Sequence, residues 1–156
     1  GRYRYTLARE MVALPEDRRA LLIVMLNPSI ADASINDPTI VRCMGFARAH
    51  GYNALTVVNL FAYRATKPAD LWSVESDALR IGPRNDEHIN EELSRHGAVL
   101  LAWGAHAGRC EERAKWIRGR AIGYGNRCIF SLGATKAGHP RHPLMVRADQ
   151  PMLRIA

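Results

Sequence analysis

The sequence predicts an α/β fold, a three-layer α/β/α sandwich around a central, mostly parallel four-stranded sheet. Two observations lead to this prediction. Four short apolar runs are nearly continuous rather than alternating, as is typical of strands that are covered on both faces. Segments with helical spacing lie between these runs, and strands that alternate with helices favour a parallel sheet. At 156 residues, the chain fits a single domain, residues 1–156.

The predicted strands are short apolar runs separated by polar loops. They are Leu21–Leu26, Leu55–Leu60, Ala98–Trp103 and Cys128–Leu132. No apolar run approaches the roughly 20 residues that a helix needs to cross a bilayer. We therefore expect a soluble protein that has no membrane partner.

Three segments between these strands show the spacing of amphipathic helices. They are Thr39–His50, Asn85–His96 and Gly108–Arg118. Gly51, directly after the first segment, is a typical helix-terminating residue. Each segment has an apolar side that can cover the sheet. The arginines of the third segment are expected to face solvent or a phosphate.

The chain is strongly basic, with a formal net charge of +7 that comes mainly from arginine. Arginine binds phosphate oxygens in a forked geometry, so the charge favours a nucleic acid or a nucleotide as partner. A protein that is basic only for solubility would have the same composition. Cys43, Cys110 and Cys128 are widely spaced and form no paired motif for a disulfide, zinc or an iron–sulfur cluster. We therefore expect no cofactor and no metal, and a cytoplasmic location.

Polar loops follow all four predicted strands. Asn27-Pro28-Ser29 follows the first, and Asn59 begins the loop "NLFAYRAT" after the second. The loops "WGAHAGR" and "LGATKAGHPRHPL" follow the third and the fourth. In an open α/β sheet, ligands bind outside the carboxyl ends of the strands. We therefore expect the four loops to converge on one crevice.

The succession "MLNPS", "VVNLFAYRAT", "LLAWG" and "TKAGHPRHPL" resembles a bacterial and phage family of unknown function, the one numbered 1643, over nearly the whole chain. The same succession is similar to the uracil-DNA glycosylase superfamily. In that superfamily, a first strand ends in Asp-Pro or Asn-Pro, a second ends in Asn and a late loop carries His-Pro. The similarity implies a uracil-DNA glycosylase-like fold, DNA as the foremost partner, and hydrolysis of the N-glycosidic bond of a damaged or modified base.

On this resemblance, Asn27 and His142 are the candidate catalytic residues. The carbonyl of Asn27 would hold the attacking water in line, and His142 would stabilise negative charge on the departing base. The planar amide of Asn59 has a donor and an acceptor that can meet the edge of a base. Met25 stands where the superfamily usually has glycine, and Ser29 where Gly or Tyr is more frequent. We therefore expect a differently shaped pocket floor.

The remaining candidate substrate-binding residues come from the same loops and from the first helix. They are Pro28, Ser29, Phe61, Arg42, Arg64, Lys136, His139 and Arg141. Phe61 either stacks on the base or is a core aromatic. Arg42 is a candidate for a substrate phosphate, whereas Asp37 suits the N-cap of the first helix better than the site. Arg64 binds substrate or belongs to a turn.

The late loop leaves two histidines to choose between. His139 and His142 are both followed by proline, and either can be the functional histidine. Lys136 and Arg141 make the loop dense in cationic groups, which favours phosphate or leaving-group binding. Leu144 and Met145 are the nearest candidates for side chains that push a base from a duplex, or they belong to a final buried strand.

The sequence leaves three functional readings open. The protein is an N-glycosidic hydrolase of the DNA glycosylase kind, a non-catalytic nucleic-acid-binding protein of the same fold, or a nucleotide or nucleoside hydrolase. Asp32 is an alternative general base or a solvated loop acid. The sequence predicts no oligomeric state.

Overall fold

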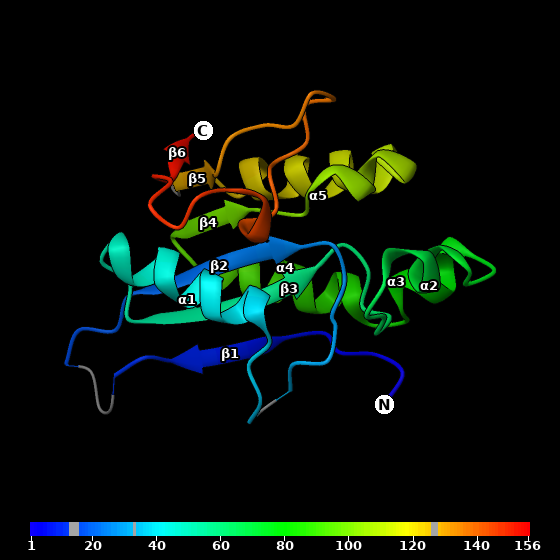
Figure 1. Ribbon diagram of the computed structural model, residues 1–156, viewed down its shortest axis with the longest axis horizontal. Coiled ribbons are helices and arrows are strands. Elements are labelled where there is room, and N and C mark those ends of the chain that lie inside the picture. The colour runs from blue at the N-terminus through cyan, green and yellow to red at the C-terminus, as the bar shows by residue number, and fades with distance from the viewer. Residues whose placement is uncertain (13–15, 33, 126–127) are drawn as a thin grey trace.

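A six-stranded mixed sheet forms the centre of the protein in the computed structural model (Figure 1). The structure describes residues 1–12, 16–32, 34–125 and 128–156. The strand order is β1-β3-β2-β4-β5-β6. The inner four strands are parallel, and the two outer strands pair antiparallel to their neighbours. The strands are β1 Leu7–Glu10, β2 Ala20–Met25, β3 Ala54–Asn59, β4 Ala98–Leu101, β5 Cys128–Ser131 and β6 Leu153–Arg154.

The α/β class and the mostly parallel sheet are confirmed, whereas the prediction of four strands is wrong. The four predicted strands are the inner strands β2 to β5. The two missed strands are edge strands with little buried surface: β1 buries Leu7 alone, and both residues of β6 are exposed. Edge strands that bury so little carry no continuous apolar run, and that run was the signal used for the prediction.

Five α-helices and two short 3₁₀ helices connect the strands of the described chain. They are α1 Pro38–Ala49, α2 Pro68–Trp72, α3 Asp77–Ile81, α4 Asn85–Arg95, α5 Glu111–Gly123, η1 Ala105–Arg109 and η2 Pro143–Met145. α1 and α4 agree with the predicted segments to within one residue. The third predicted segment divides at Cys110, which lies between η1 and α5. None of these helices in the described part of the chain is long and apolar enough to span a membrane.

Helices cover both faces of the sheet, which explains the continuous apolar strands. Alternate residues of β2 point to opposite faces. Leu21 and Ile23 pack with Phe46 of α1, while Leu22 and Val24 pack with Ile89 of α4 and with α5. In Figure 1, α1 lies in front of β2 and β3, and α4 lies behind them.

The parallel strands bring the predicted loops to one edge of the sheet. Met25 at the end of β2 is the register partner of Asn59 at the end of β3, and Leu101 at the end of β4 is the partner of Ser131 at the end of β5. The chain segments that follow these residues therefore leave the sheet on the same side.

Candidate functional site

A cavity of about 510 Å³ lies at this carboxyl edge of the sheet. Its volume is within the range of about 300–1,000 Å³ that small-molecule sites occupy. Four of the predicted site residues line it: Asn27, Ser29, Asn59 and His142. The rest of the lining comes from the same loops, from the start of α1 and from the N-terminal segment: Arg4, Met25, Leu26, Ile30, Asp37, Pro38, Thr39, Ile40, Val57, Ala65, Thr66, Pro68, Trp103, Gly104, Ala105, His106, Leu144 and Met145.

The amide of Asn27 is held in one orientation. Its Nδ2 donates to the carbonyl of Pro28 at 3.0 Å and to the carbonyl of Ala65 at 2.8 Å. The backbone N–H of Ala65 in turn donates to the carbonyl of Pro28 at 3.0 Å. Both amide protons of Asn27 are thus used within the protein, which leaves the acceptor Oδ1 for a water or a ligand.

Asn59 has the opposite property, an amide donor without a partner. The residue is 1% exposed, and its Nδ2 has no hydrogen-bond partner among the described residues. A buried polar group that stays unpaired costs roughly 1–3 kcal/mol. Because Asn59 lines the cavity, a ligand acceptor that enters there can satisfy this donor.

His142 presents a neutral imidazole. Its Nδ1 accepts the backbone N–H of Leu144 at 3.1 Å, so the proton of the neutral ring lies on Nε2. Burial lowers the pKa of His142 below its usual value, against the opposing effect of the Asp37 carboxylate, and His106 lowers it further. The ring is therefore a hydrogen-bond donor at neutral pH. Gly104, at φ +80°, packs against it: a Cβ at that position would lie 3.1 Å from the Cβ of His142.

Two charged lining residues were not predicted as site residues from the sequence. Arg4 reaches the cavity from the N-terminal segment, where its guanidinium donates to the carbonyl of Ala31; no motif near position 4 indicates this. Asp37 is the N-cap of α1, as predicted, since its Oδ1 accepts the N–H of Ile40 at 2.9 Å, and it lines the cavity as well. Thr39, Thr66 and His106 complete the polar lining; from the sequence, Thr66 is a turn residue and His106 a surface residue.

Asp32 lies outside the cavity lining. Its Oδ1 accepts the backbone N–H groups of Ser34 and Ile35 at 2.8 and 2.9 Å. These bonds lower the pKa of the Asp32 carboxyl. The arrangement is that of a loop acid that stabilises its own turn.

Three of the predicted substrate-binding residues are buried and lie outside the cavity lining: Pro28, Phe61 and His139. Phe61 is fully buried, and its ring packs edge-on against Trp72 at a centroid distance of 5.6 Å. Pro28 is also buried, and its carbonyl holds the Asn27 amide in place. A core aromatic and a core proline have the same sequence signature as ligand-binding ones, so only the packing distinguishes them.

The two histidines of the late loop lie in different places, and only His142 lines the cavity. His139 is 4% exposed; its Nδ1 accepts from the indole Nε1 of Trp103 at 3.3 Å, and its Nε2 lies 2.8 Å from a carboxylate oxygen of Glu111. His139 therefore supports the cavity wall from behind, while His142 lines the cavity. Lys136 and Arg141 are exposed, and Arg141 donates to the carbonyl of Ala134.

Five cationic residues line the cavity, line an adjoining hollow or are next to lining residues in the sequence. Arg4 lines the cavity, Arg64 and Lys67 flank its lining residues in sequence, Arg141 precedes His142, and Arg42 lines an adjoining hollow. None of these five forms an ion pair with another residue that the structure describes. Arg4 interacts electrostatically with the carboxylates of Asp37 and Asp32, so Arg42 and Arg64 are the better contacts for an anionic ligand.

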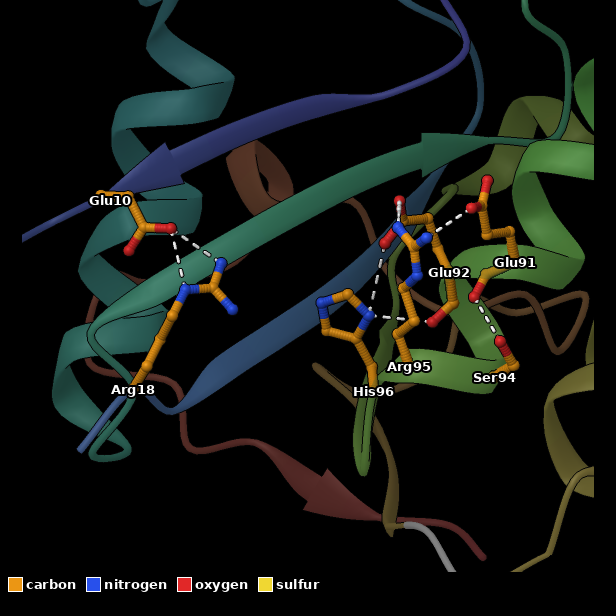
Figure 2. Close-up of polar contacts among 7 residues, drawn as sticks. All are labelled: Glu10, Arg18, Glu91, Glu92, Ser94, Arg95 and His96. Carbon is orange, nitrogen blue, oxygen red and sulfur yellow. Dashed lines mark hydrogen bonds and ion pairs between the residues drawn. The ribbon is translucent and has the colours of Figure 1, made fainter.

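The opposite, amino edge of the strands has compensated charges. A hollow of similar volume lies there, lined by Arg18, Arg95 and His96 among others. Figure 2 shows that Arg18 pairs with Glu10, and that Arg95 and His96 pair with glutamates of α4. This edge therefore carries less uncompensated positive charge than the carboxyl edge, which makes the carboxyl-edge cavity the better candidate site.

Comparison with known proteins gives a family match. The model of the family described as "Protein of unknown function (DUF1643)" matches residues 4–144. The matched span begins at Arg4 and ends at Leu144, two residues that line the cavity. The chain has no significant match among curated proteins or among solved structures.

Proposed function

The chain belongs to the DUF1643 family, so its activity has to be inferred from its site, and we propose that the cavity binds a nucleobase and hydrolyses its N-glycosidic bond. The substrate is a damaged or modified base in a nucleic acid, with DNA foremost. One observation carries this proposal. Asn27 offers a free acceptor, while Asn59 and His142 offer donors, and all three line one cavity.

The proposed reaction uses these groups in separate roles. Oδ1 of Asn27 accepts a hydrogen bond from water and aims its oxygen at the anomeric carbon. The bond from that carbon to the base nitrogen breaks, its electron pair stays on the base, and the water oxygen bonds to the sugar. Nε2–H of His142 stabilises the negative charge on the base, which takes up the proton that the water loses. An amide is a weak base, so we expect slow turnover.

The unpaired amide donor of Asn59 supports recognition of the base edge. Removing an acceptor from the ligand would leave this donor buried and unpaired, which is how a polar site discriminates between similar ligands. The same three residues support the likeness to uracil-DNA glycosylases, because they follow the strands at which that superfamily carries its motifs. A uracil-DNA glycosylase-like fold is thus part of the proposal.

A base-release assay tests the proposal. Mass spectrometry would detect free base from single- and double-stranded oligonucleotides that carry normal, deaminated and hypermodified bases. We expect release by the parent protein and loss of release in Asn27→Ala and His142→Ala. Asn90→Ala and His88→Ala, which change the same residue types outside the cavity and outside the hollow that adjoins it, serve as controls and should retain activity.

The other outcomes identify the alternatives. Salt-sensitive oligonucleotide binding with no release of any base would indicate the non-catalytic binding protein. Release from free nucleosides or nucleotides, with weak binding of oligonucleotides that hardly depends on salt, would indicate a nucleotide or nucleoside hydrolase.

A further inference from the structure

A second hollow of about 590 Å³ adjoins the cavity. The two share three lining residues, Asp37, Pro38 and Leu144, so they lie side by side. The second hollow runs along α1, and we call it the α1 groove. Its own lining includes Val41, Arg42, Gly45 and Ala148.

We propose that the α1 groove binds the nucleotide next to the one whose base occupies the cavity. The protein then acts on a strand of nucleic acid rather than on a free nucleotide. This inference rests on the proposed function for the identity of the cavity's occupant. The occupant of the groove is a second nucleotide, joined to the first through a phosphodiester bond.

The charge of the groove suits a phosphate. Arg42 uses one of its five donors, since Nη1 donates to the carbonyl of Val146 at 2.8 Å. This bond anchors the guanidinium, and Arg42 forms no ion pair with a described residue. The carboxylate in the groove, Asp37, already accepts the N–H of Ile40 as the cap of α1. An anchored guanidinium with spare donors is a suitable contact for a phosphate between two nucleotides.

The groove also offers apolar surface and open space. Val41 is 57% exposed and Leu144 is 43% exposed. Leu144 belongs to both hollows, so it divides one subsite from the other. At Gly45, a Cβ would have no atom within 4 Å. Arg42 and the exposed apolar side chains thus offer separate contacts for the phosphate and for the base of a nucleotide.

Gly45 provides a variant that fills the groove and keeps the fold. Gly45→Glu adds bulk and a negative charge in open space on a helix, and Gly45→Ala is its matched control. Arg42→Gln removes the phosphate contact. The probes are a mixture of the deoxynucleoside monophosphates, mixed-sequence dinucleotides and mixed-sequence tetranucleotides. Each competes against a fluorescent single strand, with fluorescence anisotropy as the readout.

We expect the parent and Gly45→Ala to bind the dinucleotides about tenfold more tightly than the monophosphates, because the second nucleotide is linked to the first. In Gly45→Glu and Arg42→Gln, this gain should disappear while the affinity for monophosphates stays within about twofold of the parent. Equal affinity of the parent for all probes, no binding of any probe, or a length dependence that survives in Gly45→Glu would overturn the proposal.

The design separates this inference from the proposed function. If the length dependence is lost in Gly45→Glu and the assay above shows no base release, the α1 groove binds a nucleotide but the protein does not hydrolyse the N-glycosidic bond. If base release is equal from monophosphates and oligonucleotides and is unchanged in Gly45→Glu, the protein hydrolyses the N-glycosidic bond but the α1 groove binds no second nucleotide.

Discussion

Two side chains in the cavity owe their orientation to the backbone of neighbouring residues. Nδ2 of Asn27 donates to the carbonyls of Pro28 and Ala65, and Nδ1 of His142 accepts the N–H of Leu144. Backbone partners of this kind are invisible in a sequence. The sequence therefore predicted the residue types, but not which atom of each side chain remains free for a ligand.

The tautomer of His142 leads to a prediction about pH. Burial lowers the pKa of His142 below the usual value of about 6.5, so more than half of the rings are neutral at pH 6.5. Protonation at lower pH removes the Nδ1 acceptor of the Leu144 N–H. We expect kcat/KM to fall on acidification with a midpoint below pH 6.5, and NMR titration of His142 to show the same midpoint.

His142→Ala assigns the NMR signal in this experiment. His88, which is half-buried and stacks on Tyr5 outside the cavity lining, gives an internal comparison. A midpoint for His142 above 6.5 would contradict the assigned environment and with it the neutral donor.

Burial decided which of the predicted residues line the cavity. Asn27, Ser29, Asn59 and His142 do so, whereas Phe61 and His139 are packed into the core. A loop residue's burial depends on chain segments that are distant in sequence. His139, for example, contacts Trp103 and Glu111, and no local pattern around position 139 predicts these contacts.

At the scale of elements, α4 holds the end of β3 in place. Nδ2 of Asn85, the first residue of α4, donates to the carbonyls of Asn59 and Leu60 at 3.0 and 3.2 Å. The backbone of Asn59 is therefore fixed while its own amide donor stays unpaired. An unsatisfied group in a fixed position is typical of a site in which stability is given up for binding.

This arrangement predicts opposite effects of two equivalent substitutions. Asn59→Leu removes an unpaired buried donor, so we expect the free energy of unfolding to stay level or to rise by about 1 kcal/mol while oligonucleotide binding is lost. Asn85→Leu removes the side-chain donor of the Asn59 carbonyl, whereas the Leu60 carbonyl keeps the Nε–H of Arg113 at 2.8 Å, so we expect a loss of about 1 kcal/mol. Urea unfolding measures both effects. Equal destabilisation by the two variants would contradict the assignment.

The inner strands were predictable because both faces of each are covered. Leu21 and Leu22 are buried on opposite faces, so the run is apolar throughout. The predicted runs extend slightly too far: Leu26 and Leu60 lie beyond their strands and are nevertheless buried. Short helices such as α2 and α3 offer too few turns for a periodic pattern.

At the scale of the whole molecule, the two edges of the parallel strands differ in charge compensation. Arg4 at the carboxyl-edge cavity and Arg42 in the hollow beside it form no ion pair with a described residue, whereas Arg18 and Arg95 at the amino edge are paired with glutamates (Figure 2). The net charge of +7 predicted a basic surface that binds an anionic partner. It did not predict where on the protein that surface lies, because ion pairing depends on the fold.

This difference predicts which arginines contribute to the salt dependence of binding. Arg64→Gln should weaken binding of a single-stranded oligonucleotide and lower the slope of log K against log salt concentration by about 0.7. Arg95→Gln, at the amino edge, should leave the slope unchanged. Fluorescence anisotropy at several salt concentrations measures both slopes. Equal slopes for the two variants would indicate that the oligonucleotide does not bind at the carboxyl edge.

The hydrogen bonds that join the loop after β2 to the loop after β3 determine which substitutions the site tolerates. Ala65 takes part in these bonds through its backbone N–H and carbonyl alone. Any residue with a backbone N–H that is small enough for this buried position can therefore replace it without loss of the bonds. Asn27 takes part through its side chain, and only glutamine has the same donors and acceptor, on a side chain that is one methylene longer. Variation among related chains at position 65 is therefore compatible with an intact site, whereas a change at position 27 alters the loops and the chemistry together.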